Sequence, residues 1–164
     1  MLLTEIICQL DTVEIGNRTV DYLQLEWFET TKRIIRKKTQ AGIEVSLKFL
    51  QPTRALTEGD VLYTDDKLVI AVAVNACDCL VICPGSLFEM AAICYEIGNK
   101  HLPLFYQNNQ LLVPADAPLQ RLLTAQGYTV MQQKTKLLSP LNTTVKPHTD
   151  ASNSLFNKIM KLTN

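Results

Sequence analysis

The feature of this chain that most constrains its fold is a change of hydrophobic period near Asn75. Before it, apolar and polar residues alternate in short runs, such as Leu23 to Trp27. Turns that contain glycine or acidic residues separate these runs. A period of two predicts strands, and short strands with no helical window between them predict a small β-sandwich or barrel over residues 1–74. After Asn75, helical windows appear between the apolar runs. The chain is therefore expected to be α+β, with an all-β domain first.

Residues 75–140 predict the order strand, helix, strand, strand, helix, strand. This is the order of a ferredoxin-like βαββαβ domain. Asn108 and Asn109 separate the two middle strands, and asparagine tolerates the left-handed backbone of a tight hairpin. Residues 141–164 are mainly polar, and we expect them to form a flexible C-terminal tail.

The ends of the first predicted helix follow from local signals. Ser86 and Glu89 have the spacing of a capping box, so the helix is expected to begin there. Gly98 fits the position just after a helix, where φ is positive, and Gly127 closes the second helix in the same way. His101 then lies three residues beyond the expected end of the first helix.

Charge and hydropathy exclude several classes of protein. Sixteen basic and 16 acidic residues give a formal net charge of zero, which argues against nucleic acid or an anionic membrane as the main partner. No apolar run approaches the roughly 18 residues of a spanning helix. The first ten residues contain Glu5 and no basic residue, which predicts a strand rather than a signal peptide. Five cysteines, an odd number, favour reduced thiols in the cytoplasm.

No motif for hydrolysis is present in the sequence. Both G-x-S-x-G and a glycine-rich phosphate loop are missing, and the chain has only two histidines, His101 and His148. Neither histidine has a serine or cysteine at a sequence spacing that would indicate a catalytic pair. The sequence therefore favours a protein that is not an enzyme. Distance along the sequence does not exclude a nucleophile and a histidine that lie close together in the fold.

Three cysteines lie close together at Cys77, Cys79 and Cys83. Thiolates at such a spacing can bind a metal, but a structural zinc site usually has a second close pair, which this chain lacks. Alternation along a strand places all three cysteines and Val81 on one face, where free cysteine packs as a small hydrophobe. Packing in the core is the favoured interpretation.

A basic run, TKRIIRKK, covers residues 31–38. Two isoleucines interrupt it, and Glu26 and Glu29 lie nearby, so a solvated strand edge is the favoured interpretation. Binding of an acidic partner surface stays open.

His101 has two interpretations from the residues alone. After a helix, a histidine commonly interacts with the last carbonyls and the helix dipole. As a metal ligand, a single imidazole holds a transition metal weakly, but a dimer with a two-fold axis would bring two copies of His101 to one site. His148 on the tail would then supply a further ligand. Imidazole suits nickel, copper and zinc.

The chain resembles the UreE family of urease accessory proteins, the nickel metallochaperones of urease, in five stretches: LEWFETTKRIIRKKT, GDVLY, EMAAICYEIGNKHLPL, LLVPAD and KLLSPL. The resemblance runs in order from Asp21 to Pro140. Its most specific part is CYEIGNKH, where the family has Gly-Asn-Arg-His or a close variant.

The resemblance implies a homodimer that delivers Ni(II) to apo-urease together with the GTPase of the urease maturation complex. It also implies an N-terminal domain similar to the peptide-binding modules of chaperones, and a ferredoxin-like domain that forms the dimer interface. By position, His101 matches the interfacial nickel histidine, and His148 resembles the tail histidine that completes the site in some relatives. Zn(II) is expected as an alternative occupant.

Two departures from the family pattern qualify these expectations. Many relatives end in a histidine-rich tail, whereas this tail has one histidine, so few metal ions per dimer are expected. Lys100 replaces the usual arginine, which keeps the charge but loses the planar guanidinium. Two other classes remain open: an interaction adaptor without a metal, and a thiol redox protein that uses Cys77, Cys79 and Cys83.

Overall fold

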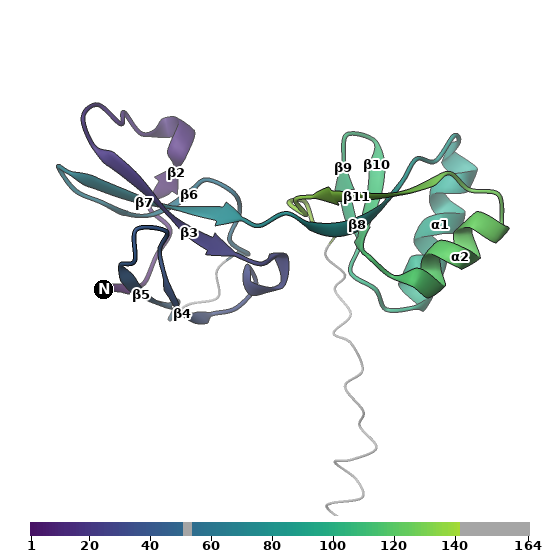
Figure 1. Ribbon diagram of the computed structural model, residues 1–164, viewed down its shortest axis with the longest axis horizontal. Coiled ribbons are helices and arrows are strands. Elements are labelled where there is room, and N and C mark those ends of the chain that lie inside the picture. The colour runs from purple at the N-terminus through teal and green to yellow at the C-terminus, as the bar shows by residue number, and fades with distance from the viewer. Residues whose placement is uncertain (51–53, 142–164) are drawn as a thin grey trace, which may run out of the picture.

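The computed structural model describes residues 1–50 and 54–141 of the chain. It has two lobes, and the segment from β7 to β8 passes from the first to the second (Figure 1). The first lobe contains strands and short turns, and the second contains a sheet with both α-helices. The fold is therefore α+β, as the change of period predicted.

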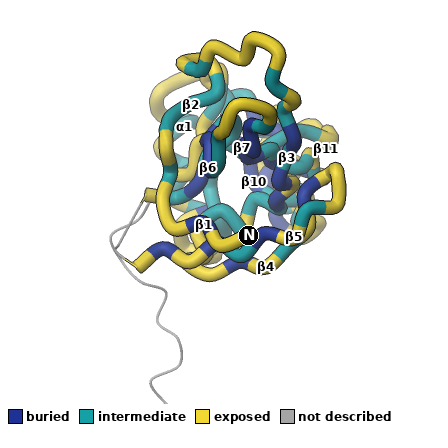
Figure 2. Tube along the Cα trace, turned by 90° about the vertical axis from the view of Figure 1, so that its left-hand side faces the viewer, coloured by how far each residue is buried: buried dark blue, intermediate teal, exposed yellow. Residues whose placement is uncertain are grey.

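The N-terminal lobe consists of two sheets. One has the order β1 (Leu2–Leu3), β5 (Glu44–Lys48), β4 (Ile34–Lys38), and the other β2 (Cys8–Gln9), β6 (Asp60–Thr64), β7 (Leu68–Val74), β3 (Thr19–Leu25). Both sheets contribute to one apolar core that includes Leu23, Leu47 and Ile70. The central strand β7 is mostly buried (Figure 2), which agrees with its unbroken valine-rich sequence.

Two 3₁₀ turns interrupt this lobe, η1 (Leu10–Thr12) and η2 (Trp27–Glu29). The alternation from Leu23 to Trp27 predicted that the strand includes Trp27, and this was wrong because β3 ends at Leu25. The N–H of Glu26 donates to Oε2 of Glu29 at 2.9 Å, which stabilises the turn in place of the strand. The turn brings Trp27 against Phe105 of the second lobe, edge to face, with the ring centroids 5.7 Å apart.

The C-terminal lobe has the strand order and helices of a ferredoxin-like domain. Its sheet runs β11 (Val130–Thr135), β8 (Cys77–Ile82), β10 (Gln110–Pro114), β9 (Phe105–Gln107), and all pairs are antiparallel. The helices are α1 (Leu87–Asn99) and α2 (Ala117–Ala125). Asn108 and Asn109 form the predicted hairpin, with φ of 49° and 61°.

The two faces of this sheet have different cores. Both helices pack on one face, where Ile93 and Ile97 of α1 meet Leu119 and Leu123 of α2 over the apolar side chains of β8 and β10. The opposite face carries Cys79, Val81, Phe105, Leu112 and Leu137, and Trp27 packs against it from the first lobe. The inner strands β8 and β10 are therefore buried on both sides, and the second side forms the junction between the lobes.

Residues 136–141 return from β11 along this junction. Lys136 forms an ion pair with Glu58 of the first lobe at 2.8 Å, and Leu138 packs against the first lobe's core. The N–H of Leu141 then donates to the carbonyl of Leu104 at 2.8 Å. Because this segment runs antiparallel to β9, its last residues lead toward the end of α1.

The predicted tail lies outside the described residues from position 142 onward, and so does His148. No helix among the described residues combines the length and the apolar character that crossing a lipid bilayer demands.

Candidate metal centre

The N-terminus of α1 forms where the capping signal predicted it. The side chain of Ser86 accepts a hydrogen bond from the N–H of Glu89 at 3.1 Å. The carboxylate of Glu89 does not close the box on Ser86; it accepts from the N–H of Gly85 at 2.7 Å. The first turn is thus capped by two side chains, and its start is well defined.

The C-terminus of α1 differs from the prediction. Gly98 is a helical residue, and the helix continues to Asn99 with Lys100 as its cap. The residue with positive φ is His101 itself, at 54°. The prediction that Gly98 ends the helix was therefore wrong, and the histidine occupies the position that was assigned to a glycine.

The bonds after α1 form a complete Schellman motif. The N–H of His101 donates to the carbonyl of Gly98 at 3.0 Å, and the N–H of Leu102 donates to the carbonyl of Ile97 at 3.3 Å. Ile97 is fully buried, and Leu102 packs against the same core. This apolar contact between the third-last position and the second residue beyond the cap is typical of the motif. It explains why the chain turns at residue 101 and not at Gly98.

The same motif closes α2 with a glycine. Gly127 has φ of 85° and donates its N–H to Thr124 at 3.0 Å, while Tyr128 donates to Leu123 at 3.0 Å. Glycine adopts positive φ freely, whereas a residue with a Cβ is strained there by roughly 1–2 kcal/mol. A strained residue that persists at one defined point is a reason to suspect a function for its side chain.

The His101 side chain is exposed, and the structure shows no hydrogen bond from its ring to another described residue. The ring therefore does not cap the last carbonyls, which was the first of the two interpretations; backbone N–H groups do so. Within residues 1–50 and 54–141, no group of three His, Cys, Asp or Glu side chains lies close enough to hold a metal ion. The described part of one chain thus offers one imidazole and no complete site.

An apolar stripe leads along α1 to His101. It consists of Phe88, Ala91, Tyr95 and Gly98, spaced by three or four residues, and His101 follows three residues later. Phe88 is 81% exposed and Tyr95 is 70% exposed. The stripe lies opposite the buried face of Ile93 and Ile97. We did not predict it, although apolar residues on both faces of one amphipathic window were the signal that could have revealed it.

The cysteines lie where strand alternation placed them. Cys79 is fully buried, Cys77 and Cys83 are half-buried against the same cluster, and the sulfurs of Cys77 and Cys79 are 3.5 Å apart. Burial, together with the neighbouring Cys77, raises the pKa of Cys79 to about 12. Its thiol therefore stays protonated near neutral pH, and a protonated thiol is a poor metal ligand and a poor nucleophile. The geometry favours core packing.

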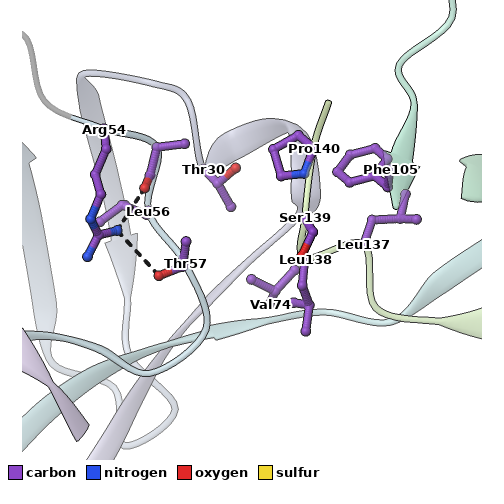
Figure 3. A pocket seen from close by; sticks show the side chains of 11 residues that line it. Thr30, Arg54, Leu56, Thr57, Val74, Phe105, Leu137, Leu138, Ser139 and Pro140 are labelled. Atoms are coloured by element: carbon purple, nitrogen blue, oxygen red, sulfur yellow. Dashed lines mark hydrogen bonds between the residues drawn. The ribbon is translucent and has the colours of Figure 1, made fainter. Parts of the chain in front are cut away.

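A cavity of about 300 Å³ lies at the junction of the lobes (Figure 3). Its lining comes from Thr30, Arg54, Ala55, Leu56, Thr57 and Val74 of the first lobe and from Phe105, Leu137, Leu138, Ser139 and Pro140 of the second. The lining is mainly apolar, and the guanidinium of Arg54 is bound by Asp60 through two hydrogen bonds of 2.6 and 2.8 Å. The cavity therefore presents neither metal ligands nor an unpaired charge.

Comparison with known proteins gives consistent matches over the whole chain. The model of the UreE urease accessory protein N-terminal domain matches residues 3–75, and that of the C-terminal domain matches residues 77–152. The urease accessory protein UreE of Flavobacterium johnsoniae is 48% identical over 163 residues, covering 99% of both chains. The UreE proteins of Acetivibrio thermocellus and Helicobacter pylori are 36% and 34% identical, over 86% and 92% of this chain and 92% and 91% of their own.

Proposed function

The chain belongs to the UreE family of urease accessory proteins, and from this premise we propose that it carries Ni(II) to apo-urease during maturation of the urease active site. The family consists of accessory proteins and not of catalytic enzymes. In this proposal the metal is cargo, bound reversibly and passed on. No substrate bond is broken.

The observation that carries the proposal is the placement of His101. The Schellman motif holds its backbone in one conformation, so the exposed imidazole projects from a defined point at the end of α1. One imidazole is too few for a transition-metal site. A second copy of the chain, related by a two-fold axis, supplies the second imidazole, and the metal lies on the axis.

The apolar stripe on α1 supports a homodimer in which this helix lies at the interface. Phe88 and Tyr95 are large and exposed, and both lie on the side of the helix that leads to His101. Gly98 offers a second argument. A Cβ added there would meet no atom within 4 Å, so nothing within the described chain requires a glycine in this helix. A glycine in an exposed helix interior lowers helix stability by roughly 1 kcal/mol, and close approach of a partner helix would explain it.

His148 is proposed as a further ligand, although it lies outside the described residues. Leu141 is the last described residue and is bonded to Leu104, three residues from His101. His148 is seven residues further along the chain. Seven extended residues span up to about 25 Å, so the chain is long enough for His148 to reach the site.

The chemistry of this site follows from imidazole. A neutral ring binds the metal and a protonated ring does not, so affinity should fall as the pH drops through the histidine range. Copper outranks nickel on nitrogen ligands, so contact with the partner proteins, and not raw affinity, selects nickel; Zn(II) is an alternative occupant. Transfer proceeds by ligand exchange with the urease maturation GTPase and the urease apoprotein complex.

The proposed setting is the cytoplasm, with neither nucleic acid nor a membrane as partner. All five cysteines are free, which supports a reducing compartment. A formal net charge of zero gives no general attraction to polyanions.

We further propose that residues 1–74 and 75–140 are two folding units, followed by a tail from 141 to 164. Separate apolar cores support this division, because the first core draws only on the first lobe and on Leu138, and the core under the helices draws only on the second.

Calorimetric titration with Ni(II), together with the mass of the assembly in solution, tests the proposal. We expect about one tightly bound Ni(II) per dimer, no tight binding in His101→Ala, and weaker binding in His148→Ala. Asn99→Ala is the matched control at the same helix end and should bind like the parent protein. If His101→Ala bound nickel as well as the parent, the carrier proposal would be wrong. If alkylation of the cysteines abolished binding while both histidine variants retained it, the thiol interpretation would replace it.

A further inference from the structure

The chain separates its charges along the sequence. Residues 30–50 contain six of the 16 basic residues and one of the 16 acidic residues, which leaves this segment with a net charge of +5 and the rest of the chain with −5. The segment folds into β4 and β5, the two longer strands of the three-stranded sheet. The strands β4 and β5 themselves contain four basic residues and one acidic residue, so this part of a neutral protein has a net charge of +3.

The strand register places basic and aliphatic side chains on the same outer face. Residues paired directly across strands share a face. Ile34 is paired with Lys48, and Arg36 is paired with Ser46, which is also paired with Leu2 of β1. Exposed and buried residues alternate along β4 and β5, as the colours of Figure 2 show, so these side chains lie on the side of the sheet away from the buried core. We call this surface, with Leu50 at its end, the outer face.

The aliphatic residues of the outer face are unusually exposed. Leu2, Ile34 and Leu50 are 64–66% exposed. Among the described residues, Arg36 and Lys48 have no carboxylate within ion-pair distance, whereas Lys38 is paired with Glu44 at 3.5 Å. A shallow hollow of about 400 Å³ lies beside them, lined by Arg36, Lys37, Lys38, Glu44, Val45 and Ser46.

We propose that the outer face binds an acidic polypeptide segment that also carries aliphatic side chains. The unpaired Arg36 and Lys48 complement carboxylates, and the exposed Ile34, Leu50 and Leu2 lose apolar surface to the aliphatic positions of the partner. On one face of a strand, side chains repeat about every 6.8 Å, which matches the alternate side chains of an extended peptide. This inference does not depend on nickel.

Other occupants fit the outer face less well. Phosphates of a nucleic acid would use the cations and leave three exposed aliphatic side chains unexplained. A membrane would need contiguous apolar side chains, whereas here cations separate them on a flat sheet. The chain's own residues 142–164 contain three lysines and one aspartate, so their charge has the same sign as the face. An acidic protein segment satisfies both the charge and the apolar character.

The test titrates the full chain with a labelled peptide built from repeats of Asp-Glu-Leu and follows fluorescence anisotropy and backbone amide shifts. We expect saturable binding with shifts in β1, β4 and β5, weakened by salt. The double variant R36E/K48E should weaken binding by about tenfold or more, since it reverses two charges at the contact. The matched control R121E/K134E makes the same change in net charge at exposed positions of α2 and β11 and should bind like the parent.

Two further arms decide the nature of the partner. A peptide in which alanine replaces every leucine should bind several-fold more weakly, and so should the parent peptide to I34S/L50S. Equal binding by the alanine peptide, or by R36E/K48E, would overturn the proposal. Stronger binding to vesicles of phosphatidylcholine and phosphatidylserine, lost in R36E/K48E, would assign the outer face to a membrane instead. A smaller assembly mass for R36E/K48E would assign it to a second copy of the chain.

Discussion

His101 and Gly127 occupy the same position in two copies of one helix-ending motif. Each follows the cap of its helix, each donates its N–H to the carbonyl three residues earlier at 3.0 Å, and each has positive φ, 54° and 85°. Glycine adopts this conformation without steric cost and histidine does not. The fold therefore retains a strained residue where its own second helix has the unstrained solution. Helix termination alone does not explain why this position is a histidine. The explanation must therefore lie in a function of its side chain.

The first prediction separates backbone strain from metal binding. His101→Gly should raise the free energy of unfolding by about 1 kcal/mol because it relieves the strain. His101→Ala should leave it nearly unchanged, since alanine keeps the Cβ. Urea denaturation followed by circular dichroism measures both. Gly127→Ala is the inverse control and should lower stability by a similar amount, because its Cβ meets no atom within 4 Å and only strain changes. A destabilised His101→Gly would contradict this account.

The fold followed from the sequence wherever periodicity and turn chemistry agreed. The period of two, the two helical windows and the Asn108–Asn109 hairpin are local signals, and the structure contains all of them. The errors arose where another contact, local or distant, overrode the signal on which the prediction rested. Gly98 was a plausible helix end, but the contact of Leu102 with Ile97 moved the turn to His101. Trp27 fitted the alternation of a strand, but the Glu26–Glu29 turn and the contact with Phe105 removed it.

The candidate site followed from the sequence only in part. A lone histidine after a helix was compatible with capping, and the resemblance to a family was needed to favour a metal. Its strained backbone depends on the packing of Leu102 against the core of the second lobe, which the position of Gly98 alone does not indicate. The apolar stripe from Phe88 to Gly98 was visible in the sequence but became informative only when the structure showed which face of α1 is buried.

A second prediction concerns the residue that positions His101. Ile97→Ala should destabilise the protein by about 2–5 kcal/mol, because Ile97 is fully buried, and should also weaken nickel binding, because it removes the contact that fixes Leu102 and the turn. Ile93→Ala is the matched control. Ile93 is equally buried, one turn further from His101, so it should destabilise similarly and leave the affinity unchanged. Calorimetry under conditions where both variants are folded measures the difference. Equal losses of affinity in both would show that Ile97 has no specific role.

A third prediction tests the proposed interface on α1. Phe88→Glu should convert the proposed dimer into a monomer, because it places a charge on the apolar stripe at a residue that is 81% exposed in one chain. The change should reduce nickel binding without altering the secondary structure. Analytical ultracentrifugation measures the mass. Met131→Glu, at an exposed apolar residue of β11, is the control and should remain dimeric.

Gly98→Ala tests the same interface, because it should stabilise the helix of a single chain and weaken association of two chains. In an isolated chain, alanine should stabilise α1 by roughly 0.5–1 kcal/mol, since no atom obstructs the new methyl group. In the proposed dimer, the methyl group should obstruct the approach of the partner helix and raise the dimer dissociation constant. A variant that dimerises as tightly as the parent would remove Gly98 from the interface.

A fourth prediction uses the single tryptophan to report on the junction of the lobes. Phe105→Ala should destabilise the protein by about 3–5 kcal/mol and shift the native emission of Trp27 to the red, because the ring that covers the indole is lost. Phe49→Ala is the matched control, since Phe49 is equally buried but lies in the core of the first lobe. It should destabilise comparably with little change in native emission. A red shift in both variants would mean that the emission of Trp27 reports on the packing of the whole protein and not on its contact with Phe105.

The last prediction concerns pH. Burial, with the neighbouring Cys77, raises the pKa of the Cys79 thiol from an ordinary value near 9 to about 12. The folded state therefore holds this proton more tightly than the unfolded state does. The contribution to stability is fully present below pH 9 and is lost as the pH rises from 9 towards about 12, because only the unfolded chain releases the proton there.

Cys79→Val isolates this contribution, because valine fills a similar volume and cannot titrate. Between pH 8 and pH 10.5, the urea midpoint of the parent protein should fall more steeply than that of Cys79→Val. Other groups that titrate in this range are common to both proteins and cancel in the comparison. Alkylation by iodoacetamide at pH 8 gives an independent check, because Cys79 should stay unmodified until the protein unfolds. Parallel pH profiles together with rapid labelling of Cys79 would show that its thiol is accessible and ionised, and would restore the thiol interpretation of this face of the sheet.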